Sequence, residues 1–167
     1  MKSLINFKAL MGVVMLAILL PVSSVSFAQR SNPAAISKLL KQAKTHAALV
    51  HDDTLMEESF TRSNLDWRTH SICLNKIKHD ANRLIADVSL LRAMREKGTR
   101  SQREAIDRIA RRVRNMAIGL NTTIQTLNRS HGTVNMPPFR DRVHANRVLA
   151  EEIYGMICKS ASRSYEI

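Results

Sequence analysis

A repeated spacing of mostly apolar residues is the feature that most constrains the fold of this chain. Between residues 67 and 91, and again between 106 and 127, such residues recur at alternating intervals of three and four. An α-helix turns once every 3.6 residues, so each set forms a stripe along one helix face. The two stripes are Trp67, His70, Leu74, Ile77, Ala81, Leu84, Val88 and Leu91, and then Ile106, Ile109, Val113, Met116, Leu120, Thr123 and Leu127.

Residues that start and stop helices bound these two stripes. Ser63 and Asp66 are expected to form an N-terminal box before the second helix, and Gly98 is a natural stop after it. Ser101 and Glu104 have the spacing of a capping box and are expected to begin the third helix. The sequence therefore predicts two helices in succession, each about 45 Å long at 1.5 Å per residue.

The first helix has a clear start and an open end. Pro33 suits a first helical turn because its φ angle is already fixed near the helical value. One version of the helix runs to about Phe60. The other breaks at residues 52–53 and lets Thr54 and Glu57 cap a longer second helix. We favour the first version because it gives helices of similar length, which pack without overhang. Its apolar positions are Ile36, Leu40, Ala43, Ala47 and Val50.

A fourth amphipathic helix is expected after Pro137 and Pro138. Its apolar positions are Phe139, Val143, Leu149, Ile153 and Ile157. Five glycines, four prolines and 4% aromatic residues are too few for the turns and core of a β-sandwich or barrel. The predicted fold class is therefore all-α, an antiparallel up-down four-helix bundle with long second and third helices, formed as a single domain by residues 29–167.

The N-terminal segment has the pattern of a secretory signal peptide. Lys2 and Lys8 precede or flank an apolar run over residues 9–20, and Ser26-Phe27-Ala28 follows as a small-x-small cleavage site. The run is shorter than the roughly 20 residues that span a bilayer, and a retained anchor is the alternative. We therefore expect residues 1–28 to be a signal peptide and the protein to be exported, to the periplasm or the extracellular space.

The chain is strongly basic. It has 26 Lys and Arg against 14 Asp and Glu, a net charge of +12, and keeps +10 without residues 1–28. Five arginines of the third helix face away from its apolar stripe, where Glu104 and Asp107 are expected to neutralise them in part. These are Arg100, Arg103, Arg108, Arg111 and Arg114.

This arginine stripe has two interpretations. It is an ordinary solvated helix face, or it binds an anionic partner such as an envelope lipid, an acidic polymer or a protein. Nucleic acid is the weaker candidate because no aromatic residues interleave with the arginines to stack on bases.

Four polar residues are expected to lie at a similar depth in the bundle. Thr54, His70, Thr123 and Asn146 fall about 8–12 Å from the end that carries the first and third loops, counting 1.5 Å per residue. His70 is the most informative of them because it interrupts an apolar stripe. They are interpreted as a buried polar layer that specifies helix register, with a ligand site as the alternative.

The two cysteines present a conflict. Export to an oxidising compartment favours a disulfide between Cys73 and Cys158. Regular helices place the two residues about 12 Å and 30 Å from the same end, whereas a disulfide needs Cα atoms within about 7 Å. The bridge is nevertheless expected. It requires that Gly155 end the last helix or that the second helix start near Thr54, and an intermolecular bridge is a third version.

No catalytic or cofactor motif is present. The sequence has no Gly-x-Ser-x-Gly, no glycine-rich phosphate loop, no Glu-x-x-His and no Cys-x-x-Cys-His. No pair of histidines has the spacing of a helical metal site. The prediction is a non-enzymatic interaction protein without a cofactor. The alternative is a haem- or metal-binding bundle that uses His70.

Three segments resemble a group of small exported all-helical bacterial proteins that have no assigned function. The segments are 65–70 (LDWRTH), 74–78 (LNKIK) and 102–109 (QREAIDRI). The resemblance covers roughly residues 67–153 and consists mostly of helix-packing patterns. It implies the helical fold and transfers no site residue.

Overall fold

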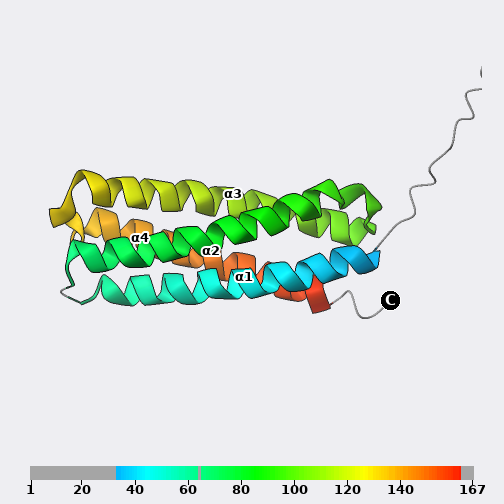
Figure 1. The fold of residues 1–167 in the computed structure, drawn as a ribbon, viewed down its shortest axis with the longest axis horizontal. Helices are drawn as coiled ribbons and strands as arrows, with labels where there is room; N and C mark the ends of the chain where they lie inside the picture. Colours follow the sequence, from blue (N-terminus) through cyan, green and yellow to red (C-terminus); the bar gives the residue numbers. More distant parts are fainter. Residues whose placement is uncertain (1–32, 64, 163–167) are drawn as a thin grey trace, which may run out of the picture.

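A computed structural model describes residues 33–63 and 65–162, and these residues form four helices (Figure 1). The expected signal peptide, residues 1–28, lies outside the described residues. The helices are α1 Pro33–Phe60, α2 Trp67–Ala93, α3 Arg100–Arg129 and α4 Pro137–Ser162. Two short 3₁₀ turns, η1 Arg95–Lys97 and η2 His131–Thr133, lie in the second and third connections.

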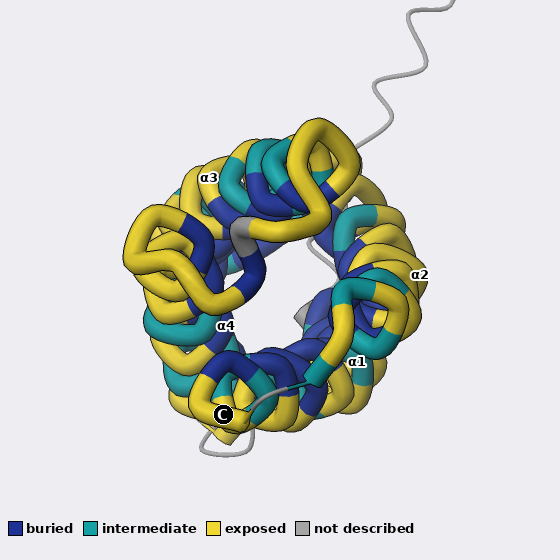
Figure 2. Tube along the Cα trace, turned by 90° about the vertical axis from the view of Figure 1, so that its left-hand side faces the viewer, coloured by how far each residue is buried: buried dark blue, intermediate teal, exposed yellow. Residues whose placement is uncertain are grey.

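The four helices form an antiparallel bundle in which each packs against two neighbours. The contacts join α1 to α2, α2 to α3, α3 to α4, and α4 back to α1, so α2 and α4 lie diagonally across the ring (Figure 2). The predicted all-α four-helix bundle is confirmed. α2 and α3 have 27 and 30 residues, and α1 and α4 have 28 and 26, so the four lengths are nearly equal.

The predicted stripes face the centre of the bundle (Figure 2). Every residue of the α3 stripe is buried, and so is every residue of the α2 stripe except Trp67, which is half-buried. The α1 stripe is buried as predicted and continues beyond Val50 with the same spacing, through Thr54, Glu57 and Thr61. This continuation explains why α1 runs to Phe60, because a break at residues 52–53 would interrupt one contiguous buried face.

Both predicted helix caps are wrong in detail. At α2, Asp66 alone is the N-cap and accepts a bond from the Thr69 backbone N–H at 3.0 Å, while the Ser63 hydroxyl bonds back to α1. At α3 the capping box lies two residues earlier than predicted, at Thr99 and Gln102, with bonds of 3.0 and 3.2 Å. Thr99 has the extended backbone of an N-cap, and Gln102 is buried. This pair therefore bonds the backbone N–H groups at the start of α3 that have no partner within the helix.

Gly155 lies inside α4, which continues through it to Ser162. A Cβ added at Gly155 would meet no atom within 4 Å. Glycine in a helix interior is less stable than alanine by about 0.5–1 kcal/mol. We expect Gly155→Ala to raise the free energy of unfolding by about that amount, measured by urea denaturation. A variant no more stable than the parent would show that α4 is interrupted here.

Candidate functional site

The arginine stripe of α3 lies on the outside of the bundle. Arg100, Arg108, Arg111 and Arg114 are exposed and Arg103 is half-buried. The acids expected to neutralise the stripe are partly engaged elsewhere. Glu104 accepts a bond from Arg100 at 3.1 Å, but Asp107 is held by Arg95 of η1 through two bonds of 2.8 Å. This paired grip of Arg95 lowers the pKa of Asp107 and keeps it ionised.

The remaining arginines of the stripe carry unbalanced charge. Among the ion pairs of residues 33–63 and 65–162, none includes Arg103, Arg108, Arg111 or Arg114. Arg112, on the flank towards α4, pairs with Glu152 at 3.2 Å and lies outside this set. We call Arg103, Arg108, Arg111 and Arg114 the basic face. None of these four guanidinium groups is held in an ion pair by an acid of the described part of the chain, so the face keeps a net positive charge.

A groove runs beside the basic face, between α2 and α3. It consists of two adjoining hollows of about 210 and 170 Å³ that share Ile85 and Ala117. The side chains that line it come from both helices: Lys78, Ala81, Asn82, Ile85, Val88, Ser89 and Arg92, and Ala110, Val113, Arg114, Ala117, Leu120, Asn121 and Ile124.

The composition of this groove is distinctive. Its floor is aliphatic, its rim carries the cations Lys78, Arg92 and Arg114, and no carboxylate lines it. Because Ala110 and Ala117 have small side chains, part of the space between α2 and α3 stays unfilled. Arg114 thus belongs both to the basic face and to the groove. The sequence analysis predicted the arginine stripe but not the groove. The signal available was the pair of alanines one heptad apart on α3.

The four residues of the predicted polar layer are all buried, but only Thr123 and Asn146 bond to each other. His70 is fully buried, and its Nδ1 lies 2.8 Å from Glu57 Oε1. The Asn146 side-chain amide donates to the Thr123 hydroxyl at 2.9 Å. Thr54 bonds to the backbone of its own helix through its hydroxyl.

A very small cavity connects part of this layer. Thr54, Glu57 and Asn146 line a space of about 10 Å³, which is the size of one water molecule. Glu57 is the member that sequence reasoning treated only as an alternative cap. The signal was its place in the α1 stripe, three residues after Thr54 and seven after Val50.

The carboxyl group of Glu57 and the imidazole ring of His70 form a buried, hydrogen-bonded pair. Burial raises the pKa of Glu57, although the hydrogen bond to His70 opposes the shift. Phe60 and Phe139 pack their rings nearly perpendicular to the His70 ring, at centroid distances of 6.5 and 5.4 Å. The second oxygen of Glu57 and Nε2 of His70 have no protein partner. His70 is thus enclosed by Glu57 and two aromatic rings, with one ring nitrogen unbonded.

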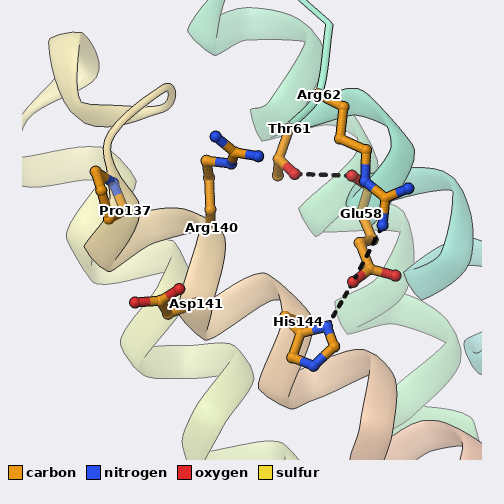
Figure 3. A pocket seen from close by; sticks show the side chains of 7 residues that line it. All are labelled: Glu58, Thr61, Arg62, Pro137, Arg140, Asp141 and His144. Carbon is orange, nitrogen blue, oxygen red and sulfur yellow. Dashed lines mark hydrogen bonds and ion pairs between the residues drawn. The ribbon is translucent and has the colours of Figure 1, made fainter.

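A larger surface pocket of about 310 Å³ lies between the end of α1 and the start of α4 (Figure 3). Its central carboxylate, Glu58, is already bound by His144 at 2.6 Å and by Arg147 at 2.8 Å. Arg140 and Asp141 line the same pocket and bring opposite charges to it. The charges of this pocket are mixed, and the ion pairs of Glu58 with His144 and Arg147 join α1 to α4.

Cys73 and Cys158, the expected disulfide partners, are not bonded to each other in the structure. The intermolecular version of the bridge stays a prediction. Cys73 lies on α2, with its sulfur 3.8 Å from the Asp53 carbonyl oxygen, and burial raises its thiol pKa to about 12. Cys158 lies on the diagonally opposite helix. It is one turn, about 5 Å, beyond Tyr154, whose ring stacks on His51. Cys158 is therefore displaced along the bundle away from the level of Cys73.

Among the described residues, no group of three or more His, Cys, Asp or Glu side chains is arranged to hold a metal ion. None of the helices in the described part of the chain is both long and apolar enough to cross a lipid bilayer. Comparisons of the chain with models of protein families, with curated proteins and with solved structures found no match. The arguments for function therefore rest on the surface chemistry of the bundle.

Proposed function

We propose that this chain is an exported, non-enzymatic interaction protein that binds an anionic partner through the basic face of α3. The observation that carries the proposal is the unbalanced charge of Arg103, Arg108, Arg111 and Arg114. Arg95 occupies Asp107, one of the two acids expected to neutralise them. Export is supported by the signal-peptide pattern of residues 1–28.

A rigid scaffold favours this role. α3 buries one continuous stripe and is capped at its N-terminus by the Thr99–Gln102 box, so its outer arginines have a fixed spacing. Fixed cations lose less conformational entropy on binding than cations of a mobile segment. The haem or metal alternative has less support, because His70 is fully buried and bonded to Glu57, beside a cavity of only about 10 Å³.

The test is the salt concentration at which the protein elutes from a sulfated polysaccharide column. We expect the triple variant Arg103→Gln, Arg108→Gln, Arg111→Gln to elute at clearly lower salt than the parent, because salt screens exposed charges over a Debye length of about 10 Å at 0.1 M.

The matched control removes three positive charges from α1. Lys38, Lys41 and Lys44 are exposed, and their triple change to Gln gives the same net charge as the arginine variant. The proposal predicts that this control elutes close to the parent. Equal displacement of both variants would show that net charge, and not the basic face, determines binding.

A further inference from the structure

The groove between α2 and α3 combines an aliphatic floor with a cationic rim. Its aliphatic floor offers a place for a hydrocarbon chain, and its rim offers three cations and no carboxylate. We propose that the groove binds one molecule of a free single-chain anionic lipid, with the hydrocarbon chain on the floor and the head group between Arg92 and Arg114. This inference rests on the proposed function and names the ligand class.

The dimensions of the groove suit such a ligand. The α2 residues that line it extend from Lys78 to Arg92, a rise of about 21 Å at 1.5 Å per residue. One acyl chain spans half of a bilayer core about 30 Å thick, or roughly 15 Å, which leaves space for a head group. The two hollows together fall within the roughly 300–1,000 Å³ of small-molecule sites, whereas an added helix about 10–12 Å wide would not fit inside them.

The position of the cations sets the orientation of the ligand. Arg92 of α2 and Arg114 of α3 line the same hollow from its two sides. Neither belongs to an ion pair in residues 33–63 and 65–162. Two guanidinium groups match the oxygens of a phosphate or carboxylate in a paired, forked geometry. The other hollow has the amides of Asn82 and Asn121 and a single ammonium, Lys78, so its end has less positive charge.

The floor explains why the ligand needs a chain as well as a charge. Ile85 and Ala117 lie where the two hollows meet, and Val88, Val113, Leu120 and Ile124 extend the apolar surface in both directions. Burying methylene groups is favourable, so a chain along the floor adds affinity that an inorganic anion lacks.

Isothermal titration calorimetry of the full chain tests the inference. The probes are lauroyl lysophosphatidylglycerol below its micelle concentration, the zwitterionic lauroyl lysophosphatidylcholine, and glycerol 3-phosphate as a head group without a chain. We expect one molecule of the anionic lipid to bind per protein. The other two probes are expected to bind at least about tenfold more weakly, since each lacks either the net charge or the apolar area.

Two variants locate the site. Ala117→Phe fills the junction of the hollows and is expected to weaken lipid binding about tenfold or more, while Ala145→Phe adds the same ring to an exposed position on α4 and is expected to bind as the parent does. Arg92→Gln with Arg114→Gln is expected to weaken binding by a similar factor and to abolish the preference for the anionic lipid. Ala117→Leu is the substitute if the phenylalanine variant does not fold.

The outcomes separate this inference from the proposed function. Salt-sensitive elution from the polyanion column without binding of the single-chain lipid overturns the inference and leaves the proposed function in place. Binding of the lipid only as part of vesicles that contain phosphatidylglycerol, with Ala117→Phe unaffected, also overturns it, because a membrane surface would then be the partner. Loss of both the elution and the lipid signals would reject the two together.

Discussion

Replacing His70 by leucine is expected to lower the free energy of unfolding by about 3–5 kcal/mol, as is typical when one partner of a buried pair is removed. His70 is fully buried and its only side-chain partner in the described structure is Glu57, at 2.8 Å. Without His70, the carboxyl group of Glu57 remains in the core and loses the hydrogen bond that favours its charged form. Urea denaturation of the variant, followed by far-UV circular dichroism, measures the loss.

The double variant His70→Leu with Glu57→Met is the informative control. It removes both polar groups and fills their space with side chains of comparable volume. Such replacements of a buried pair are often neutral or stabilising, so the double variant should recover most of the lost stability. A double variant as unstable as His70→Leu would show that the pair contributes net stability, contrary to its interpretation as a device that specifies helix register.

Gly119→Ala is expected to destabilise the protein by about 2 kcal/mol, although alanine has the higher helix propensity. A Cβ at this position would lie 2.5 Å from Asn146 Oδ1. Asn146 is buried and donates to Thr123 at 2.9 Å, so moving its side chain away from the new Cβ strains or breaks that bond. The crowding and the lost hydrogen bond together exceed the gain of about 1 kcal/mol in propensity.

Two comparisons isolate the cause of this effect. Gly155→Ala makes the same chemical change in α4 with open space around it, and should shift stability in the opposite direction. Adding Asn146→Ala to Gly119→Ala removes the oxygen that the new Cβ meets, so the two changes together should cost less than the sum of their separate effects. Strict additivity would mean that Gly119 and Asn146 are not in contact.

Much of the fold follows from local patterns, and the misses have identifiable physical causes. Stripes with a spacing of three and four define helices and their buried faces without reference to tertiary structure, which is why the bundle was predictable. The capping box was misplaced because Thr99 and Ser101 both have a suitable partner three residues later. The backbone conformation of the turn after η1 determines which of the two residues is the N-cap of α3.

The candidate site was less predictable, because it depends on which helix sides meet. The disulfide was inferred from the compartment, but Cys73 and Cys158 lie on diagonal helices, which a linear sequence does not reveal. The groove requires that Arg92 and Arg114 face one hollow across two helices. The burial of Glu57, in contrast, could be predicted, since this residue continues the spacing of the α1 stripe.

The most direct test of the central claim, that the groove between α2 and α3 binds a single-chain anionic lipid, is an NMR titration of the ¹⁵N-labelled protein with lauroyl lysophosphatidylglycerol. The account predicts shift changes in the amides of residues 78–92 and 110–124 that saturate at one equivalent and weaken as salt is raised. Changes centred on the pocket around Glu58 and His144, or no saturable change at all, would contradict it.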